Sequence, residues 1–105
     1  MVVFEVTSVS EFDDMCDEYP KVIVAATADY GPCTVMEPVF SKLSDQFSEI
    51  HFVKVDTDMI QDLGKKMGVE AMPTFIFYKD GNKVHEVEGA DPVQLEKHTR
   101  LLRSS

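Results

Sequence analysis

Apolar and polar residues follow one another along the chain with periods that are typical of strands and helices. Val3 to Thr7 alternates between the two kinds of residue, as a half-buried strand does. Lys21 to Thr27 is almost entirely apolar, which favours a central strand buried on both faces. Ile50 to Asp56 is a second apolar run, interrupted by Lys54. These segments predict the first three strands of one sheet.

Helical segments separate these strands. Ser8 and Glu11 have the spacing of a capping box, and the helix that they open must end before Pro20. A longer helix follows the second strand and ends near Phe47, with a kink expected at Pro38. The apolar residues of this longer helix recur at helical spacing: Met36, Phe40, Leu43 and Phe47.

The second half of the chain predicts a third helix, a hairpin and a final helix. Thr57 or Asp58 is expected to cap the third helix, and Gly68 is expected to end it in the left-handed conformation. Asp80-Gly81-Asn82 is a strong signal for a tight turn between two antiparallel strands. The expected bounds are residues 74–78 and 83–87 for these strands and residues 91–102, opened by Asp91-Pro92, for the final helix.

The order of elements is therefore β-α-β-α-β-α-β-β-α. The early alternation implies parallel strands joined by crossover helices, and the late hairpin adds antiparallel strands. We expect an α/β fold with a central mixed sheet and helices on both faces. The 105 residues, 44% of them apolar, fit one compact domain over residues 1–105.

The charge of the chain excludes several classes of partner. Nineteen acidic residues against ten lysines and arginines give a net charge of −9. Nucleic acid and anionic membrane surfaces would be repelled, because both are bound mainly through basic groups. The three histidines lie on different elements, with no spacing typical of a metal site: His51, His85 and His98. We expect no nucleic acid, membrane, metal or cofactor.

The N-terminus and the cysteines indicate a cytoplasmic protein. Met1 to Glu5 has no basic segment and already contains an acid, which does not fit a signal peptide. Two cysteines without such a signal favour a reducing compartment over a disulfide framework.

The loop Tyr30-Gly31-Pro32-Cys33 looks like a thiol–disulfide active site from which the first cysteine is missing. In a Cys-x-x-Cys loop one thiolate attacks a substrate disulfide, and the second thiol resolves the mixed disulfide. Tyrosine can do neither.

Five stretches carry a resemblance to a known family. They are Gly31-Pro32-Cys33 leading into Pro38-x-Phe40-x-x-Leu43-Ser44, then Phe52-Val53-Lys54-Val55-Asp56, Met72-Pro73-Thr74-Phe75, Lys79-Asp80-Gly81 and Glu88-Gly89-Ala90. In this order and spacing the chain resembles the thioredoxin family along almost its whole length, and most closely the small animal-type cytosolic thioredoxins. The resemblance implies the thioredoxin fold.

The chain departs from the thioredoxin pattern within the site. The family's loop is Trp-Cys-Gly-Pro-Cys, so Tyr30 replaces the attacking cysteine and Asp29 replaces the flanking tryptophan. The family also buries an aspartate in the preceding strand, where it helps to move a proton to or from the second cysteine. Counting back from the loop places Val24 there, with Ala25 beside it. The lysine that accompanies this acid is matched by Lys54, the candidate for a proton relay, which we expect to reach solvent.

Cys33 has two interpretations. A helix N-terminus favours the thiolate, whereas shielding by Tyr30 and the negative charge of Asp29 disfavour it. We expect a poor nucleophile that is kept as a small buried apolar residue; the alternative is a reactive single thiol. Cys16 belongs to the first helix, which we expect on the opposite face of the sheet, so we expect a free thiol rather than a disulfide with Cys33.

The resemblance also implies a peptide-binding groove. Met72-Pro73-Thr74 resembles the family's cis-proline turn, whose backbone pairs with an extended polypeptide as an added strand. The alternative is a turn with only a structural role. The residues that would form this groove are Ala71, Met72, Pro73, Thr74, Gly89 and Ala90.

Two functions compete on this basis. The first is a thioredoxin-like protein with little or no dithiol–disulfide reductase activity, which binds polypeptide partners in the peptide groove. The second is a one-thiol oxidoreductase, in which Cys33 forms mixed disulfides with glutathione, a target protein or a second copy in a homodimer. A third interpretation, in which Tyr30 itself contacts a partner, has less support. Any enzymatic activity would be that of a protein-disulfide oxidoreductase acting through Cys33.

Overall fold

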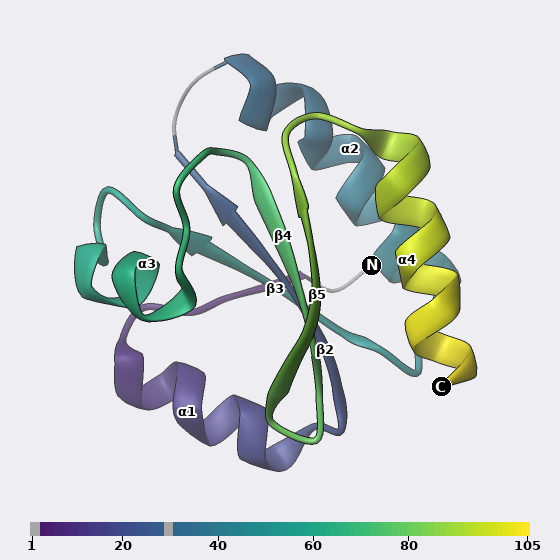
Figure 1. Cartoon of the computed structure of the whole chain (residues 1–105), viewed down its shortest axis with the longest axis horizontal. Coiled ribbons are helices and arrows are strands. Elements are labelled where there is room, and N and C mark those ends of the chain that lie inside the picture. The colour runs from purple at the N-terminus through teal and green to yellow at the C-terminus, as the bar shows by residue number, and fades with distance from the viewer. Residues whose placement is uncertain (1–2, 29–30) are drawn as a thin grey trace.

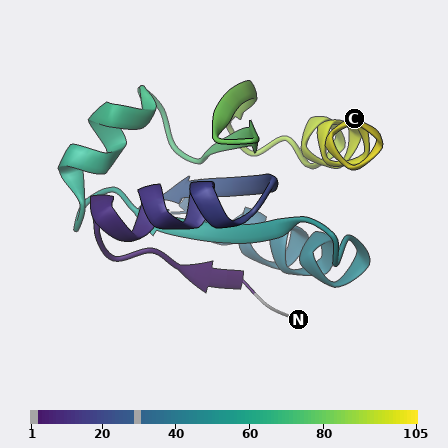
Figure 2. The same ribbon diagram turned by 90° about the horizontal axis from the view of Figure 1, so that it is seen from below.

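The computed structural model describes residues 3–28 and 31–105 and places them in a five-stranded sheet with helices on both sides (Figure 1). The strand order is β1-β3-β2-β4-β5, which Figure 2 shows from β1 at the bottom to the β4–β5 hairpin at the top. The strands are β1 (Val3–Glu5), β2 (Lys21–Thr27), β3 (His51–Asp56), β4 (Thr74–Lys79) and β5 (Asn82–Glu88). The helices are α1 (Val9–Glu18), α2 (Gly31–Gln46), α3 (Gln61–Met67) and α4 (Pro92–Ser104).

The sheet is mixed, as the sequence predicts. β3 pairs in parallel with β1 on one side and with β2 on the other. β4 is antiparallel to β2, and β5 is antiparallel to β4. Residues 22–26 of β2 are all buried, which confirms the prediction of a central strand covered on both faces.

Two apolar cores lie on the two faces of this sheet. One is built with α1 and α3 and includes Phe12, Cys16 and Val24. The other is built with α2 and α4 and includes Phe40, Phe75 and Leu95. Figure 1 shows the same division, with α1 and α3 on one side of the strands and α2 and α4 on the other. We call the second side the α2 face.

The N-terminus of α1 is capped as predicted. The Glu11 N–H donates to Ser8 Oγ at 3.1 Å, and the Thr7 N–H donates to Glu11 Oε1 at 3.0 Å. This second bond explains why β1 is shorter than the predicted Val3 to Thr7 segment. Thr7 already belongs to the cap, and the strand ends at Glu5.

The start of α3 differs from the prediction. The helix begins at Gln61, and its N-cap is Ile60, whose side chain makes no capping hydrogen bond. The predicted caps Thr57 and Asp58 lie in a preceding turn, where Asp56 Oδ1 accepts from the Asp58 N–H at 3.0 Å. Asp56, which precedes both predicted caps, therefore accepts the local backbone hydrogen bond, as aspartates in turns often do. The helix ends as predicted, with Gly68 at φ 74°.

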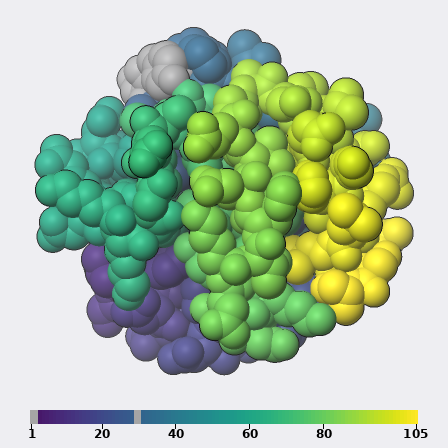
Figure 3. Space-filling model, in the orientation of Figure 1, coloured from purple at the N-terminus to yellow at the C-terminus, as the bar shows by residue number. Residues whose placement is uncertain are grey.

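The β4–β5 hairpin is tighter than the three-residue signal suggests. Asp80 and Gly81 have φ angles of 53° and 82°, and Asn82 already begins β5. Two consecutive positive φ angles are typical of a two-residue type I′ turn. Figure 3 shows this hairpin running across the molecular surface between α3 and α4.

None of the helices within the described residues has the length and the apolar character needed to cross a membrane.

Candidate functional site

Cys33 lies in the first turn of α2, directly after the exposed residues Gly31 and Pro32. Its side chain is buried, with 3% of the residue exposed. The Ala28 N–H donates to Cys33 Sγ at 3.4 Å, which joins the sulfur to the chain that leaves β2. The predictions for Asp29 and Tyr30 fall outside the described residues.

The residues predicted for the peptide groove come from two loops that the structure brings together. The Met72–Pro73 peptide bond is cis. The Gly89 N–H donates to the carbonyl of Pro73 at 2.7 Å. The hydroxyl of Thr74 donates to the carbonyl of Ala71. The two loops therefore form one continuous edge, with Ala90 exposed beside it.

Thr57 connects this edge to the end of β2. Its hydroxyl lies 3.1 Å from the carbonyl oxygen of Thr27 and 2.6 Å from Met72 Sδ. The Thr57 N–H also donates to the Thr27 carbonyl at 3.0 Å. Thr57 thus packs the cis-proline turn against the strand that leads into the loop, which is a different role from the helix cap predicted for it.

The two residues considered for the position of the missing acid, Val24 and Ala25, lie on opposite faces of the sheet. Counting back from the loop selects Val24, but Val24 packs into the core formed with α1 and α3. Its neighbour Ala25 faces α2 and lines a cavity together with Cys33. The strand residue that faces the thiol is therefore Ala25. Neighbouring residues of a strand point to opposite sides of the sheet. The assignment of the family's acid to Val24 stays a prediction.

Lys54 shares the α2 face with Ala25, with which it pairs across β2 and β3. It is half-buried and lines the same cavity as Cys33. Within residues 3–28 and 31–105 no carboxylate forms an ion pair with Lys54. The expectation that Lys54 reaches solvent agrees with its partial exposure, and its role as a proton relay stays a prediction.

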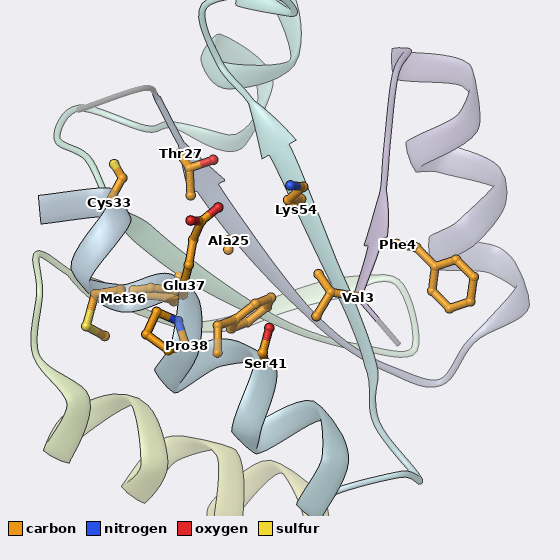
Figure 4. A pocket seen from close by; sticks show the side chains of 12 residues that line it. Val3, Phe4, Ala25, Thr27, Cys33, Met36, Glu37, Pro38, Ser41 and Lys54 are labelled. Atoms are coloured by element: carbon orange, nitrogen blue, oxygen red, sulfur yellow. The ribbon is translucent and has the colours of Figure 1, made fainter. Parts of the chain in front are cut away.

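A cavity of about 620 Å³ lies between α2 and the sheet, and we call it the α2 cavity. Figure 4 shows its walls, with Lys54 on the strand side and the carboxylate of Glu37 rising from α2 over Ala25 toward Thr27. A smaller cavity of about 160 Å³ adjoins it and shares four of its residues: Thr27, Cys33, Glu37 and Lys54.

Glu37 is the residue that sequence reasoning missed. A signal for it was present, because residues four apart in a helix lie on the same face. Glu37 follows Cys33 by four residues within α2. Both line the two cavities.

Cys16 is buried on the opposite side of the sheet, as predicted, and both cysteines are free thiols. Burial raises the pKa of the Cys16 thiol, and the nearby carboxylates of Asp13 and Asp17 raise it further. Lys66, which forms a 2.6 Å ion pair with Asp13, partly offsets this effect.

The histidines are less scattered than the sequence suggests. His85 on β5 and His98 on α4 stack with ring centroids 3.6 Å apart. His51 stacks on Tyr19 at 3.8 Å. Among the residues that the structure describes, no group of three or more His, Cys, Asp or Glu side chains is placed to hold a metal ion.

Comparison with known proteins identifies close relatives of this chain. Thioredoxin-2 of Pyricularia oryzae is 41% identical over 97 residues, which cover 91% of this chain but 57% of that protein. Thioredoxin-1 of Schizosaccharomyces pombe is 38% identical over 96 residues, which cover 90% of this chain and 93% of that protein. Both relatives are fungal, so the closer resemblance to animal-type thioredoxins stays a prediction.

Solved structures agree with the sequence relatives. A thioredoxin from Malassezia sympodialis matches with a TM-score of 0.92 at 34% identity, over 98% of this chain and 96% of that one. Mitochondrial thioredoxin 3 from Saccharomyces cerevisiae also matches with a TM-score of 0.92, at 35% identity over 95% of each chain. A family model described as Thioredoxin matches residues 3–100. The chain therefore belongs to the thioredoxin family of disulfide oxidoreductases.

Proposed function

We propose that this chain is a thioredoxin-family protein that binds polypeptides and does not turn over their disulfides. Dithiol exchange needs one thiol to attack and a second thiol to resolve the mixed disulfide. The sequence has Tyr30 where the family has the attacking cysteine. The remaining Cys33 is 3% exposed, so a protein disulfide has little access to its sulfur. This burial is the observation that carries the proposal.

The polypeptide would bind along the edge formed by residues 71–74 and 89–90. The support for this is the hydrogen bond from Gly89 to the Pro73 carbonyl, which holds the two loops side by side. An extended segment can add to such an edge as a strand, with backbone hydrogen bonds giving affinity. The net charge of −9 favours a basic segment, because opposite charge speeds and strengthens the encounter.

An insulin-disulfide reduction assay with thioredoxin reductase and NADPH tests the loss of turnover. We expect no turnover from the wild-type protein and a measurable rate from Tyr30→Cys, which restores two thiols in the loop. Tyr30→Cys combined with Cys33→Ser is the matched control, and it should be inactive again. Wild-type turnover at the rate of an ordinary thioredoxin would contradict the proposal.

Calorimetric titration with a basic, extended peptide tests the binding. Ala71→Trp places a large side chain at the edge of the peptide groove and should weaken binding by about tenfold or more, equivalent to about 1.4 kcal/mol. Ser10→Trp adds the same ring at an exposed position of α1 and should leave the affinity unchanged. Equal effects of the two substitutions would place the peptide elsewhere.

The second candidate function is that of a one-thiol oxidoreductase, including a disulfide-linked homodimer. The observation that favours it is that Cys33 is a free thiol in the first turn of α2, directly after the loop. Electrophoresis without reductant separates this candidate from the first. A covalent adduct with a target protein or a second copy, lost in Cys33→Ser, would favour it.

A further inference from the structure

Cys33 is buried from the outer surface but lines two adjoining cavities on the α2 face. The α2 cavity, at about 620 Å³, lies within the range of roughly 300–1,000 Å³ that is typical of small-molecule sites. Its walls are mainly apolar, with a few polar groups that converge on one end (Figure 4). A small molecule can therefore reach the neighbourhood of this thiol where a folded protein cannot.

The charges around Cys33 select the kind of small molecule. Glu37 points into the α2 cavity from the helix turn that follows Cys33 (Figure 4). Among residues 3–28 and 31–105 it forms no ion pair. The smaller cavity carries three carboxylates and one ammonium group: Glu5, Glu37, Asp56 and Lys54.

The carboxylates of the smaller cavity outnumber its ammonium group by three to one, so its lining is negatively charged overall. Glu5 of β1 pairs with Lys54 of β3, so the two side chains stand next to each other on the α2 face. Asp56 uses its carboxylate in the turn that precedes α3, where it accepts from the Asp58 N–H. Glu37 lines both cavities, and together with the excess of carboxylates in the smaller cavity it complements a cation.

We propose that the two cavities form a binding site for small, amine-bearing disulfides that exchange with Cys33. The Cys33 sulfur attacks one sulfur of the bound disulfide, whose S–S bond breaks as the new S–S bond forms. The other half leaves as a thiolate and takes up a proton equivalent to the one that Cys33 gives up. One disulfide replaces another, so no outside oxidant or reductant is needed. This inference goes beyond the peptide-binding function, because it concerns a small molecule and a different surface from the peptide groove. It rests on the second candidate function, that of a one-thiol oxidoreductase, and names the class of disulfide that Cys33 would take.

Three disulfides of similar size and different charge test the proposal: cystamine, bis(2-hydroxyethyl) disulfide and 3,3′-dithiodipropionic acid. Full-length protein with Cys16→Ser is used, so that the mass of the adduct reports Cys33 alone. We expect the rate of adduct formation to saturate with cystamine, as a binding step before the reaction requires. Cystamine should react about tenfold faster than the dicarboxylate, because a nearby carboxylate attracts one and repels the other.

Glu37→Gln is the decisive variant, and Glu70→Gln, at an exposed position outside both cavities, is its matched control. Glu37→Gln should remove most of the preference for cystamine and change the rate with the neutral disulfide by no more than about twofold. Glu70→Gln should leave the preference intact. The proposal is overturned by the absence of an adduct, by equal rates for the three disulfides, by rates that rise linearly with cystamine, or by equal effects of the two substitutions. None of these outcomes bears on the insulin or peptide experiments, so the two proposals fail separately.

Discussion

Lys54 on β3 pairs with Ala25 on β2, so a charged side chain stands beside a methyl group on the face of the sheet that holds Cys33. In the thioredoxin pattern, an acid and a lysine occur together near the second cysteine. Here the acid on the strand is absent, and the carboxylate of Glu37 reaches the same cavity from α2 (Figure 4).

This pairing predicts an energetic coupling between Ala25 and Lys54. Ala25→Asp buries a carboxylate and should lower the unfolding free energy. This loss should be about 1–3 kcal/mol smaller in a protein that keeps Lys54 than in one that carries Lys54→Met. Urea unfolding of the wild type, the two single variants and the double variant measures the coupling. Lys42→Met, at an exposed position of α2, serves as the control and should give additive costs.

The burial of Cys16 predicts a slowly reacting thiol. Its pKa is raised above the ordinary value of 9.0, mainly by burial and then by Asp13 and Asp17. In a Cys33→Ser background, alkylation by iodoacetamide should therefore reach half of its maximal rate only above pH 9.0. Asp17→Asn removes one negative neighbour and should move this midpoint downward. A midpoint below the ordinary value would contradict the role of burial.

The raised pKa of Tyr78 predicts that the folded protein loses stability at alkaline pH. Burial, assisted by the negative charges of Cys16 and Glu86, raises the pKa of Tyr78 from 10.0 to about 12. The folded protein thus holds the phenol proton more tightly than the unfolded chain does. The resulting stabilisation is complete below pH 10 and is lost as the pH rises to about 12.

The size of this contribution follows from the shift. We expect the unfolding free energy to fall by about 2–3 kcal/mol over this pH range. Tyr78→Phe keeps the ring that packs edge-on against Phe12 at 5.5 Å but removes the phenol proton. Urea unfolding at several alkaline pH values should show a shallower decline for this variant, while Tyr19→Phe keeps the wild-type slope. An unchanged slope in Tyr78→Phe would assign the decline to other groups.

Two glycines near the end of α3 predict opposite effects of the same substitution. Gly64 lies inside α3, and a Cβ there would meet Thr57 Cγ2 at 3.5 Å, an ordinary contact. Gly64→Ala should stabilise the protein by about 0.5–1 kcal/mol, because glycine is a poor helix former. Gly68 has a φ of 74°, so Gly68→Ala should cost about 1 kcal/mol. Thermal unfolding of both variants checks the signs, and two changes of the same sign would contradict this account.

The elements that the sequence predicts correctly are those with strong local signals. The apolar run of β2 and the Ser8–Glu11 cap depend on residues close together in the chain, and the structure confirms both. The prediction for the start of α3 was wrong because three neighbouring residues can each take a cap-like role. Asp56 takes the turn and Thr57 bonds to Thr27, which leaves Ile60 at the N-cap.

The candidate site is harder to predict, because it depends on which face of a strand each residue occupies. The sequence identified Cys33 and Lys54, and the structure places both at the α2 cavity. It did not reveal that Ala25 faces this cavity, since the face of each residue depends on the register between β2 and β3 rather than on the loop. Glu37 escaped notice because no motif marks it, although its spacing from Cys33 within α2 does.

The sheet stands between the two thiols, with Cys16 in the core against α1 and Cys33 beside α2. The chain consequently has no internal cystine to form, since a bridge requires Cα atoms within about 7 Å. Every oxidised form must carry something foreign, either an added group or another polypeptide. The mass of the oxidised protein would therefore identify the group or polypeptide attached to it.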